Sequence, residues 1–336
     1  MLRTTVIRSS TSLALAVLVS ALCACSDEGN SPWTRAPSQD AGADVALEAS
    51  QAEAAADSAP EAASEDVAEP VEAAAQDVAQ QDAEDPAAAA AARQSILDTA
   101  SGSACYDYEW KDRGQAPLAY IKGMALVYGR AVCNQSRSDV VVVSKAKTSD
   151  GEHDALAWYS AIFSGLGMSN DAAGVDTLRH AYTLLTGLGM RESSGEHCCG
   201  RDTSASNTSA ETAEAGAWQT SWNSHVFSTE LPLLFDKYMA DDSGCLLDVF
   251  SQGVTCSASN WESYGSGDGF DFQELEKNCP AFAAEYAAVM LRVSGGSVGH
   301  YGPLRTRAAE VRPECDELFQ QVQAIIAQTP SVCGLL

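Results

Sequence analysis

The chain has 336 residues and carries 46 acidic side chains against 20 lysines and arginines, which gives a net charge of −26. Such an excess of negative charge excludes nucleic acid as a partner, because phosphates are bound by lysine and arginine. More than half of this net charge lies within residues 26–92, where sixteen acidic residues accompany one basic residue. The rest of the chain is long enough for one sizeable domain with a buried core.

The N-terminus has the pattern of an export signal. Two arginines precede the apolar run of residues 12–25, SLALAVLVSALCAC, which is too short to span a bilayer. Leu22 and Ala24 before Cys25 fit the bacterial lipobox. We therefore expect residues 1–24 to be a signal peptide and Cys25 to be lipidated. The alternative is an ordinary signal peptide that is cleaved nearby.

Residues 25–92 are composed mainly of Ala, Glu, Asp, Gln, Ser and Pro, with Trp33 as the one aromatic residue. A segment with so little apolar surface and so much like charge is expected to be a disordered tether. Ser26, directly after the lipidated cysteine, favours the outer membrane. The sequence thus predicts an exported protein that is lipid-anchored to the bacterial cell envelope, and it identifies no protein partner.

Residues 93–336 contain nine cysteines. In an exported protein they predict disulfides, up to four of them, with one thiol left over. The alternative is a metal site in EHCCGRD, formed by His197, Cys198, Cys199 and Asp202. The usual zinc spacings are missing there, so we expect neither a metal ion nor another cofactor.

The apolar pattern of residues 93–336 predicts a mainly α-helical domain. In residues 117–133, for example, Leu118, Ile121 and Ala125 recur at three- and four-residue steps. Only DVVVVS, residues 139–144, looks like a strand, and its flanks leave it ambiguous. The segments in which we expect helices are 117–133, 154–168, 176–193, 229–240, 280–293 and 313–326.

One short motif ends the helix expected at 176–193, and a second follows that helix. The first is Glu192-Ser193, and the second is AGAWQ, which contains Gly216, Trp218 and Gln219. This order resembles the Glu-Ser and Gly-x-x-Gln motifs of the lysozyme-like superfamily, namely the soluble lytic transglycosylases and goose-type lysozymes. The resemblance implies a lysozyme-like helical fold and a catalytic acid at Glu192. It also implies that Ser193 supports that acid and that Gly216 and Gln219 line a sugar cleft.

The chain also departs from the family pattern. The insert between the motifs is long and carries Asp202, which is a possible second carboxylate for hydrolysis. The third motif, Ala-Tyr-Asn-Ala-Gly, is not evident. The nearest candidates for its tyrosine are Tyr286, in AAEYAAV, and Tyr301, in GHYGP. Each of these tyrosines is either a contact for substrate or a packing residue.

The chemistry of the first motif can be argued from the residues alone. A carboxyl group that leaves an apolar helix is desolvated, so it keeps its proton near neutral pH and can act as a general acid. Gln219 can bind N-acetyl and hydroxyl groups, and Trp218 offers either core bulk or a flat face to a sugar. Together with this chemistry and the expected lipid anchor, the resemblance implies an enzyme that cleaves the MurNAc–GlcNAc bonds of peptidoglycan, as a lytic transglycosylase. The alternatives are a hydrolytic lysozyme or chitinase and a cell-wall-binding lipoprotein without turnover.

Overall fold

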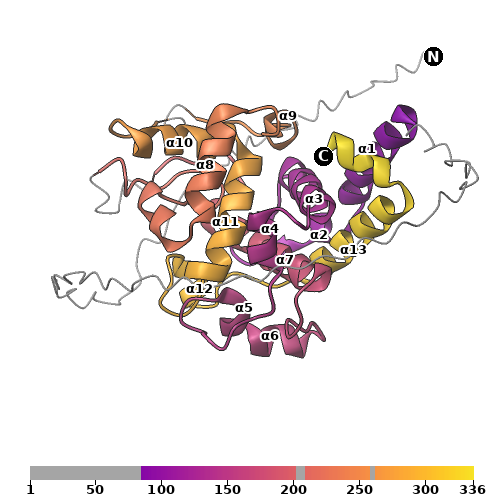
Figure 1. Cartoon of the computed structure of the whole chain (residues 1–336), viewed down its shortest axis with the longest axis horizontal. Coiled ribbons are helices and arrows are strands. Elements are labelled where there is room, and N and C mark those ends of the chain that lie inside the picture. Colours follow the sequence, from indigo (N-terminus) through magenta and orange to yellow (C-terminus); the bar gives the residue numbers. More distant parts are fainter. Residues whose placement is uncertain (1–84, 202–208, 258–261) are drawn as a thin grey trace, which may run out of the picture. The chain divides into compact units, whose positions relative to one another are not determined.

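The computed structural model describes residues 85–201, 209–257 and 262–336, and within these ranges the fold is mainly helical (Figure 1). The one described sheet is a two-stranded hairpin, β1 (Glu109–Trp110) with β2 (Gly114–Gln115). Two 3-10 helices, η1 (Trp222–Phe227) and η2 (Pro330–Leu335), complete the regular structure. The α-helices are α1 (Pro86–Ser101), α2 (Ala104–Asp107), α3 (Leu118–Cys133), α4 (Ser138–Ser144), α5 (Ala155–Trp158), α6 (Ser160–Gly165), α7 (Val175–Ser193), α8 (Glu230–Ala240), α9 (Leu247–Phe250), α10 (Asp268–Asn278), α11 (Pro280–Ser294), α12 (Gly302–Arg305) and α13 (Pro313–Gln328).

The expected mainly helical class is confirmed, and five of the six expected helices form nearly as expected, as α3, α7, α8, α11 and α13. The sixth, expected at residues 154–168, is divided at Tyr159 into α5 and α6. At this bend Trp158 donates from Nε1 to the carbonyl of Leu304, at 2.9 Å. The bend therefore accompanies a contact with the distant helix α12, which the local spacing of apolar residues cannot predict.

The strand-like segment at 139–144 is helical, which corrects the interpretation of its β-branched residues. It forms most of α4, where Val140 and Val143 are buried against the core. Asp139 lies in the first turn, where a negative charge is favourable, and it binds Arg137 at 2.6 Å. Tertiary packing of one apolar face thus outweighs the preference of valine for strands.

Helix α1 begins at Pro86, inside the alanine-rich segment expected to be tether. Asp85 caps this helix by accepting from the amide of Ala87, at 2.9 Å. Ala89 and Ala92 are buried where α1 packs on α3, α13 and η2. Alanine is the best helix former, and its small side chain lets helices approach closely, so a segment without large apolar residues still joins the core. The rest of the expected tether, like the expected signal peptide and Cys25, lies outside the described residues.

Helix α11 lies at the centre of the described fold (Figure 1). It contacts α3, α4 and α7 as well as α8 and α10. Nearly all of its residues are buried, as expected for a helix that is apolar on every side. Helix α7 packs on α3, α4, α11 and α13. The last turn of α7 is therefore held by core packing and not by a loop.

Four disulfides join segments that are distant in sequence, which confirms the expected covalent framework. Cys105–Cys315 joins α2 to α13, and Cys133–Cys333 joins the end of α3 to η2. The other two described pairs are Cys198–Cys256 and Cys245–Cys279. These four pairs use eight of the nine cysteines of residues 93–336, and the ninth is Cys199.

Candidate active site

Helix α7 places Glu192 at its last turn, two residues after the buried Met190. The helix ends because Ser194 takes a left-handed conformation, with φ 57°, and Gly195 follows with φ 77°. A Cβ atom at Gly195 would lie 2.8 Å from the ring of Tyr120, so glycine is required for this close turn. Glu192 is thereby fixed, half-buried, at the edge of the core.

Ser193 joins the two sequence motifs. Its Oγ donates to the carbonyl of Ala217 at 2.8 Å, and it also lies 3.1 Å from the carbonyl of Gly189, one turn back in α7. Ser193 is buried, so these bonds are shielded from water. The Glu-Ser motif and the AGAWQ motif, predicted as separate parts of one site, are therefore in direct contact.

The AGAWQ motif forms a tight turn closed by the bridge between Ala215 and Thr220. Gly216 has φ 75°, and a Cβ atom there would lie 2.6 Å from Oε2 of Glu276. Gln219 also has a positive φ, 48°, and its Nε2 donates to the carbonyl of Gly216 at 3.0 Å. Gln219 is 8% exposed, and the hydrogen bond of its amide group stabilises the turn.

Trp218 lies in the core, and its ring is fully buried. Its Nε1 donates to the carbonyl of Leu185 in α7 at 3.0 Å, and its ring lies 6.0 Å from that of Tyr120. The sequence left open whether Trp218 packs in the core or contacts a sugar, and this geometry fits packing in the core. The tryptophan anchors the turn against α7, and it presents no face to a sugar as the structure stands.

The surroundings of Glu192 favour its protonated form. The pKa of Glu192 is raised to about 8, mainly by burial and also by the nearby Glu214 carboxylate. The positive charges of Arg113, Arg305 and Arg191 act in the opposite direction but are outweighed. The C-terminal end of α7 also disfavours a negative charge. A carboxyl group in this position holds its proton at neutral pH and can donate it.

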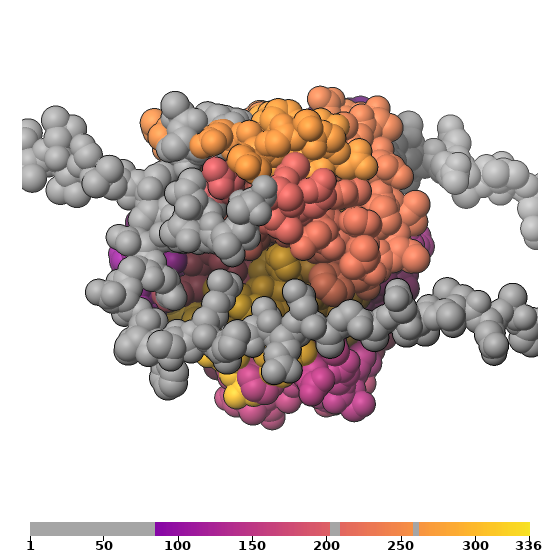
Figure 2. Space-filling view, turned by 90° about the vertical axis from the view of Figure 1, so that its left-hand side faces the viewer, coloured from indigo at the N-terminus to yellow at the C-terminus, as the bar shows by residue number. Residues whose placement is uncertain are grey.

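The segment after α11 supplies Tyr301, one of the two candidates for the third motif, and α12 supplies Arg305. Tyr301 is buried, its hydroxyl lies 3.2 Å from Oγ1 of Thr220, and burial raises its pKa, with a further contribution from Glu192. Arg305 is exposed and close enough to Glu192 to act on its pKa. Figure 2 shows a hollow in one face of the molecule, below the orange part of the chain and floored by yellow residues from the part that follows α11.

Tyr286 lies deeper than Tyr301. Its ring is fully buried in α11, and its hydroxyl lies 3.0 Å from Oγ of Ser224. It packs against Phe272 and Phe282 with ring centroids 5.0 and 5.4 Å away. Charge from Glu192 acts on Tyr301 but is not among the influences on Tyr286. Of the two tyrosines, Tyr301 is therefore the one that the structure brings to Glu192.

The sequence analysis missed Glu276, a buried carboxyl group of α10 beneath the Gly216 turn. It is fully buried, and neither of its oxygens has a hydrogen-bond partner among the described residues. Burial raises the pKa of Glu276 well above its usual range, so the group is neutral. By contrast, the equally buried Glu285 of α11 binds Arg137 at 2.9 Å. The spacing of Glu276 in a helix rich in charged residues carries no signal of this burial.

The second carboxylate proposed from the sequence, Asp202, lies outside the described residues. Of the other acidic residues between the motifs, Glu211 is exposed and Glu214 is the one that acts on Glu192. Glu214 is half-buried on the chain that leads into the AGAWQ turn. The structure thus brings one further carboxylate, that of Glu214, to Glu192.

The cysteine-rich insert brings His197, Cys198 and Cys256 together, with their ligand atoms within 4.8 Å of one another. The two sulfurs form a disulfide, and disulfide sulfur is not the thiolate that binds zinc. Nδ1 of His197 lies 2.9 Å from the carbonyl of Lys277, which it reaches by donating its proton. The cluster therefore acts as a covalent support for the chain that follows Glu192, and it does not fit a metal ion in this state.

Comparison of the chain with protein-family models, with curated proteins and with solved structures finds no match. Among the described residues, no helix combines the length and the apolar character that crossing a membrane requires.

Proposed function

We propose that the chain cleaves the glycan strands of peptidoglycan and that Glu192 is its general acid. The observation that carries the proposal is a half-buried glutamate with a pKa of about 8, held at the end of a core helix and bonded through Ser193 to a Gly-x-x-Gln turn. Arg305 and Tyr301 lie close to the same carboxyl group. An acid that is protonated at neutral pH is what cleavage of a glycosidic bond requires.

The reaction that we favour is lytic. Glu192 donates its proton to the glycosidic oxygen as the bond between C1 of N-acetylmuramic acid and this oxygen breaks. The 6-hydroxyl group of the same sugar then attacks C1, and its proton passes to the Glu192 carboxylate. The products are a 1,6-anhydro sugar and a free 4-hydroxyl group, and the enzyme returns to its starting state. This reaction needs one carboxyl group, and the structure supplies it.

A hydrolytic reaction is the second candidate, and Glu214 favours it. Hydrolysis with inversion uses a second carboxylate to activate water, and Glu214 is close enough to Glu192 to raise its pKa. Asp202 would be the other candidate base, from outside the described residues. In this reaction the products would carry ordinary reducing ends.

Incubation of the purified protein with peptidoglycan, followed by mass spectrometry of the released fragments, tests the proposal. Lytic cleavage yields 1,6-anhydro ends, about 18 mass units below the hydrolysed products because one water is not added. Reducing ends that disappear in a Glu214→Gln variant would instead assign hydrolysis, with Glu214 as the base. A parallel assay with chitin tests whether another amino-sugar polymer is the substrate. Binding to cell walls without fragment release would contradict both reactions and leave a non-catalytic wall-binding protein.

The proposed location follows from the N-terminal signal. We propose that the protein is exported, lipidated at Cys25 and held by the acidic segment beside the peptidoglycan, on the periplasmic side of the outer membrane. The residues that carry this proposal lie outside the described part of the chain, so it rests on the pattern of residues 12–25. An anchored enzyme of this kind would reach the wall from the membrane.

A further inference from the structure

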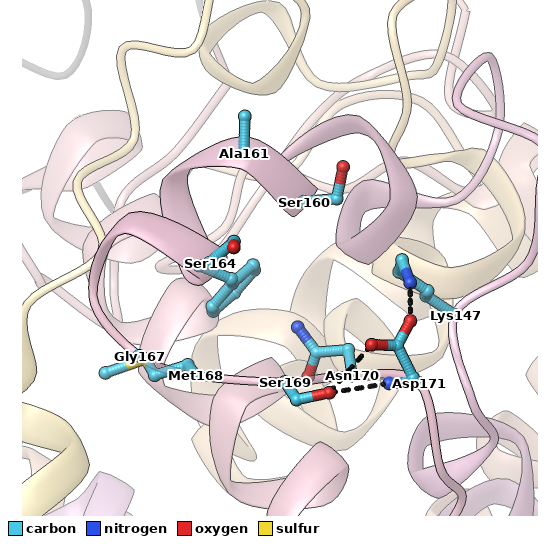
Figure 3. A pocket seen from close by; sticks show the side chains of 10 residues that line it. Lys147, Ser160, Ala161, Ser164, Gly167, Met168, Ser169, Asn170 and Asp171 are labelled. Atoms are coloured by element: carbon cyan, nitrogen blue, oxygen red, sulfur yellow. Dashed lines mark hydrogen bonds and ion pairs between the residues drawn. The ribbon is translucent and has the colours of Figure 1, made fainter.

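A second candidate site lies at the other end of α7, where α6 and the loop after it enclose a cavity of about 480 Å³ (Figure 3). The site is separate from Glu192. Asn170 in its wall binds His180, which lies twelve residues before Glu192 in α7. At 1.5 Å per residue, the two sites are about 18 Å apart along the helix. The cavity volume falls in the range of small-molecule sites.

The amide group of Asn170 has a hydrogen-bond donor that no described residue uses. The residue is 3% exposed, and its Nδ2 has no partner among the described residues, although it lines the cavity. Its Oδ1 lies 2.8 Å from Nδ1 of His180. In Figure 3 the amide nitrogen of Asn170 points toward the space between Ser164 and Lys147.

The partners of His180 fix which end of the Asn170 amide faces the cavity. Nε2 of His180 lies 3.4 Å from Nη2 of Arg179, and a guanidinium group only donates. Oδ1 of Asp316 also faces Nε2, but at 3.8 Å it lies beyond hydrogen-bond distance. The nearer guanidinium therefore favours Nε2 as the acceptor, with the proton of the neutral ring on Nδ1. Burial lowers the pKa of His180, which agrees with a neutral ring. Because Nδ1 donates, the oxygen of Asn170 faces His180 and the NH2 group is left for a ligand.

The charges in the wall favour a neutral ligand. Lys147 and Asp171 are the charged residues of the lining, and they form an ion pair with each other. Asp171 also accepts from the hydroxyl of Ser169 at 2.9 Å (Figure 3). With these charges neutralised, the unused donor of Asn170 calls for a neutral acceptor such as an amide carbonyl, and a free carboxylate or phosphate finds no unpaired cation.

The remaining wall has an apolar part and a hydroxyl-bearing part. Phe163 and Met168 are buried and line the cavity, and they offer an apolar surface to a methyl group. Ser160 and Ser164 add hydroxyl groups at the rim. A ligand that matches this wall carries a carbonyl group, a methyl group next to it and several hydroxyl groups. An acetamido sugar has all three.

We propose that this cavity binds an N-acetylhexosamine unit of a glycan, with the acetamido carbonyl accepting from Nδ2 of Asn170 and the methyl group against Phe163 and Met168. The choice of an amino sugar over another neutral amide rests on the proposed function. The cavity would hold a glycan strand at a second point, while Glu192 acts on the strand elsewhere.

Methionine-methyl NMR tests the proposal, because each site has its own reporter. Met168 lines the cavity, whereas Met190 lies two residues before Glu192. Chitotetraose is titrated into the full-length Glu192→Gln protein, which prevents turnover, and the two signals are assigned with Met168→Leu and Met190→Leu. The Met168 signal is expected to shift saturably. Cellotetraose, which has the same linkage without acetamido groups, is expected to leave it unchanged.

Two variants test the cavity itself. Ser164 is exposed, so Ser164→Trp fills the cavity without disturbing the core, and it is expected to abolish the Met168 response. Asn170→Asp keeps the acceptor for His180 but replaces the donor, and it is expected to weaken binding at least about tenfold. Ser251→Trp, at an exposed serine outside the lining, is the matched control and should change nothing.

A Met168 signal that ignores chitotetraose, that responds equally to cellotetraose, or that still responds in Ser164→Trp would overturn the proposal. Titration with free N-acetylglucosamine and with peptidoglycan fragments then separates a site for single sugars from one for glycan strands. The outcome is independent of turnover. If the Met168 signal responds but the native protein releases no fragments, glycan binding in the cavity is supported and the proposed cleavage is contradicted. If fragments are released but the Met168 signal does not respond, cleavage is supported and glycan binding in the cavity is contradicted.

Discussion

At the scale of single residues, the site depends on one carboxyl group whose surroundings oppose its ionisation. Glu192 combines burial, a neighbouring carboxylate and a helix C-terminus, all of which favour the protonated form. Three arginines lie near enough to moderate this effect, so the proton remains transferable. A proton that is held at neutral pH and released once a sugar oxygen gains charge is the property of a general acid.

Glu192→Gln is expected to lower the rate of peptidoglycan cleavage by about a hundredfold or more, because glutamine keeps the shape and removes the proton. The measurement is the rate of fragment release, with circular dichroism to show that the fold is retained. Glu211→Gln is the control, since Glu211 is an exposed glutamate of the same region, and its activity should be unchanged. Near-normal turnover by Glu192→Gln would assign the acid to another residue.

The pKa of Glu192 also predicts how stability varies with pH. Its pKa is about 8 in the folded chain against 4.5 for the free side chain, so the folded state holds a proton that the unfolded state has lost between these values. Stability therefore falls as pH rises from about 4.5 to about 8. Relative to the native chain, Glu192→Gln should gain about 1 to 3 kcal/mol by pH 8, a range reduced because solvent screens a half-buried group.

Thermal melts of both proteins at pH 4.5, 6 and 8.5 measure this gain. The difference in Tm between variant and native chain should be small at the lowest pH and largest at the highest. Activity should likewise fall as pH rises through about 8, because the acid is then ionised. A stability difference that does not vary with pH would show that Glu192 has an ordinary pKa.

At the scale of elements, the site is a junction between a core helix and a tight turn. Ser193 and Trp218 bind the turn to α7 through the carbonyls of Ala217 and Leu185. Gly216 lets the turn lie directly on Glu276 of α10. Three segments distant in sequence thus determine where Gln219 lies relative to Glu192.

Gly216→Ala is expected to destabilise the protein by about 2 to 4 kcal/mol and to lower activity. The alanine would have to keep the left-handed backbone conformation of Gly216, with φ 75°. Its Cβ atom would lie 2.6 Å from Oε2 of Glu276 and 3.0 Å from the backbone oxygen of Glu276. Gly253→Ala is the matched control, because Gly253 has φ 74° with nothing within 4 Å of its Cβ position. It should cost only the backbone strain, about 1 kcal/mol. Denaturant unfolding compares the two, and equal losses would show that contact with Glu276 is unimportant.

At the scale of the whole molecule, disulfides join the two ends of the described fold. Cys133–Cys333 and Cys105–Cys315 span 200 and 210 residues, and both bring the C-terminal segment back to helices near the start of the domain. A link across such a long loop restricts the unfolded chain strongly, by about 5 kcal/mol in the chain-entropy model. Covalent links of this kind suit an exported protein, where thiols are oxidised.

Cys25→Ser is expected to move the protein out of the detergent-soluble membrane fraction, because it removes the proposed site of lipidation. Fractionation of cells, with mass spectrometry of the mature N-terminus, measures the effect. Cys23→Ser is the matched control, since it leaves the cysteine of the lipobox in place. An unchanged membrane fraction and no acyl mass on Cys25 would show that the chain has an ordinary signal peptide.

The sequence by itself determined the mainly helical class, most of the helix positions and the use of cysteines in disulfides. These properties follow from local information, namely the helical spacing of apolar residues and the oxidising destination indicated by the N-terminal signal. The position of Glu192 on the last turn of a core helix belongs to the same group, because the inward stripe of residues 176–193 leads directly to it.

Only the tertiary structure decided what surrounds that glutamate. Glu276 lies under the Gly216 turn, and Tyr301, not Tyr286, lies close to Glu192, because α11 and α12 pack on α7 and α10 packs on α11. The ring of Trp218 is buried for the same reason. Valines 140–143 form a helix because one face packs on the core. Contacts between distant segments set burial, and burial sets both the pKa of an acid and the face that a side chain presents, so no local pattern contains them.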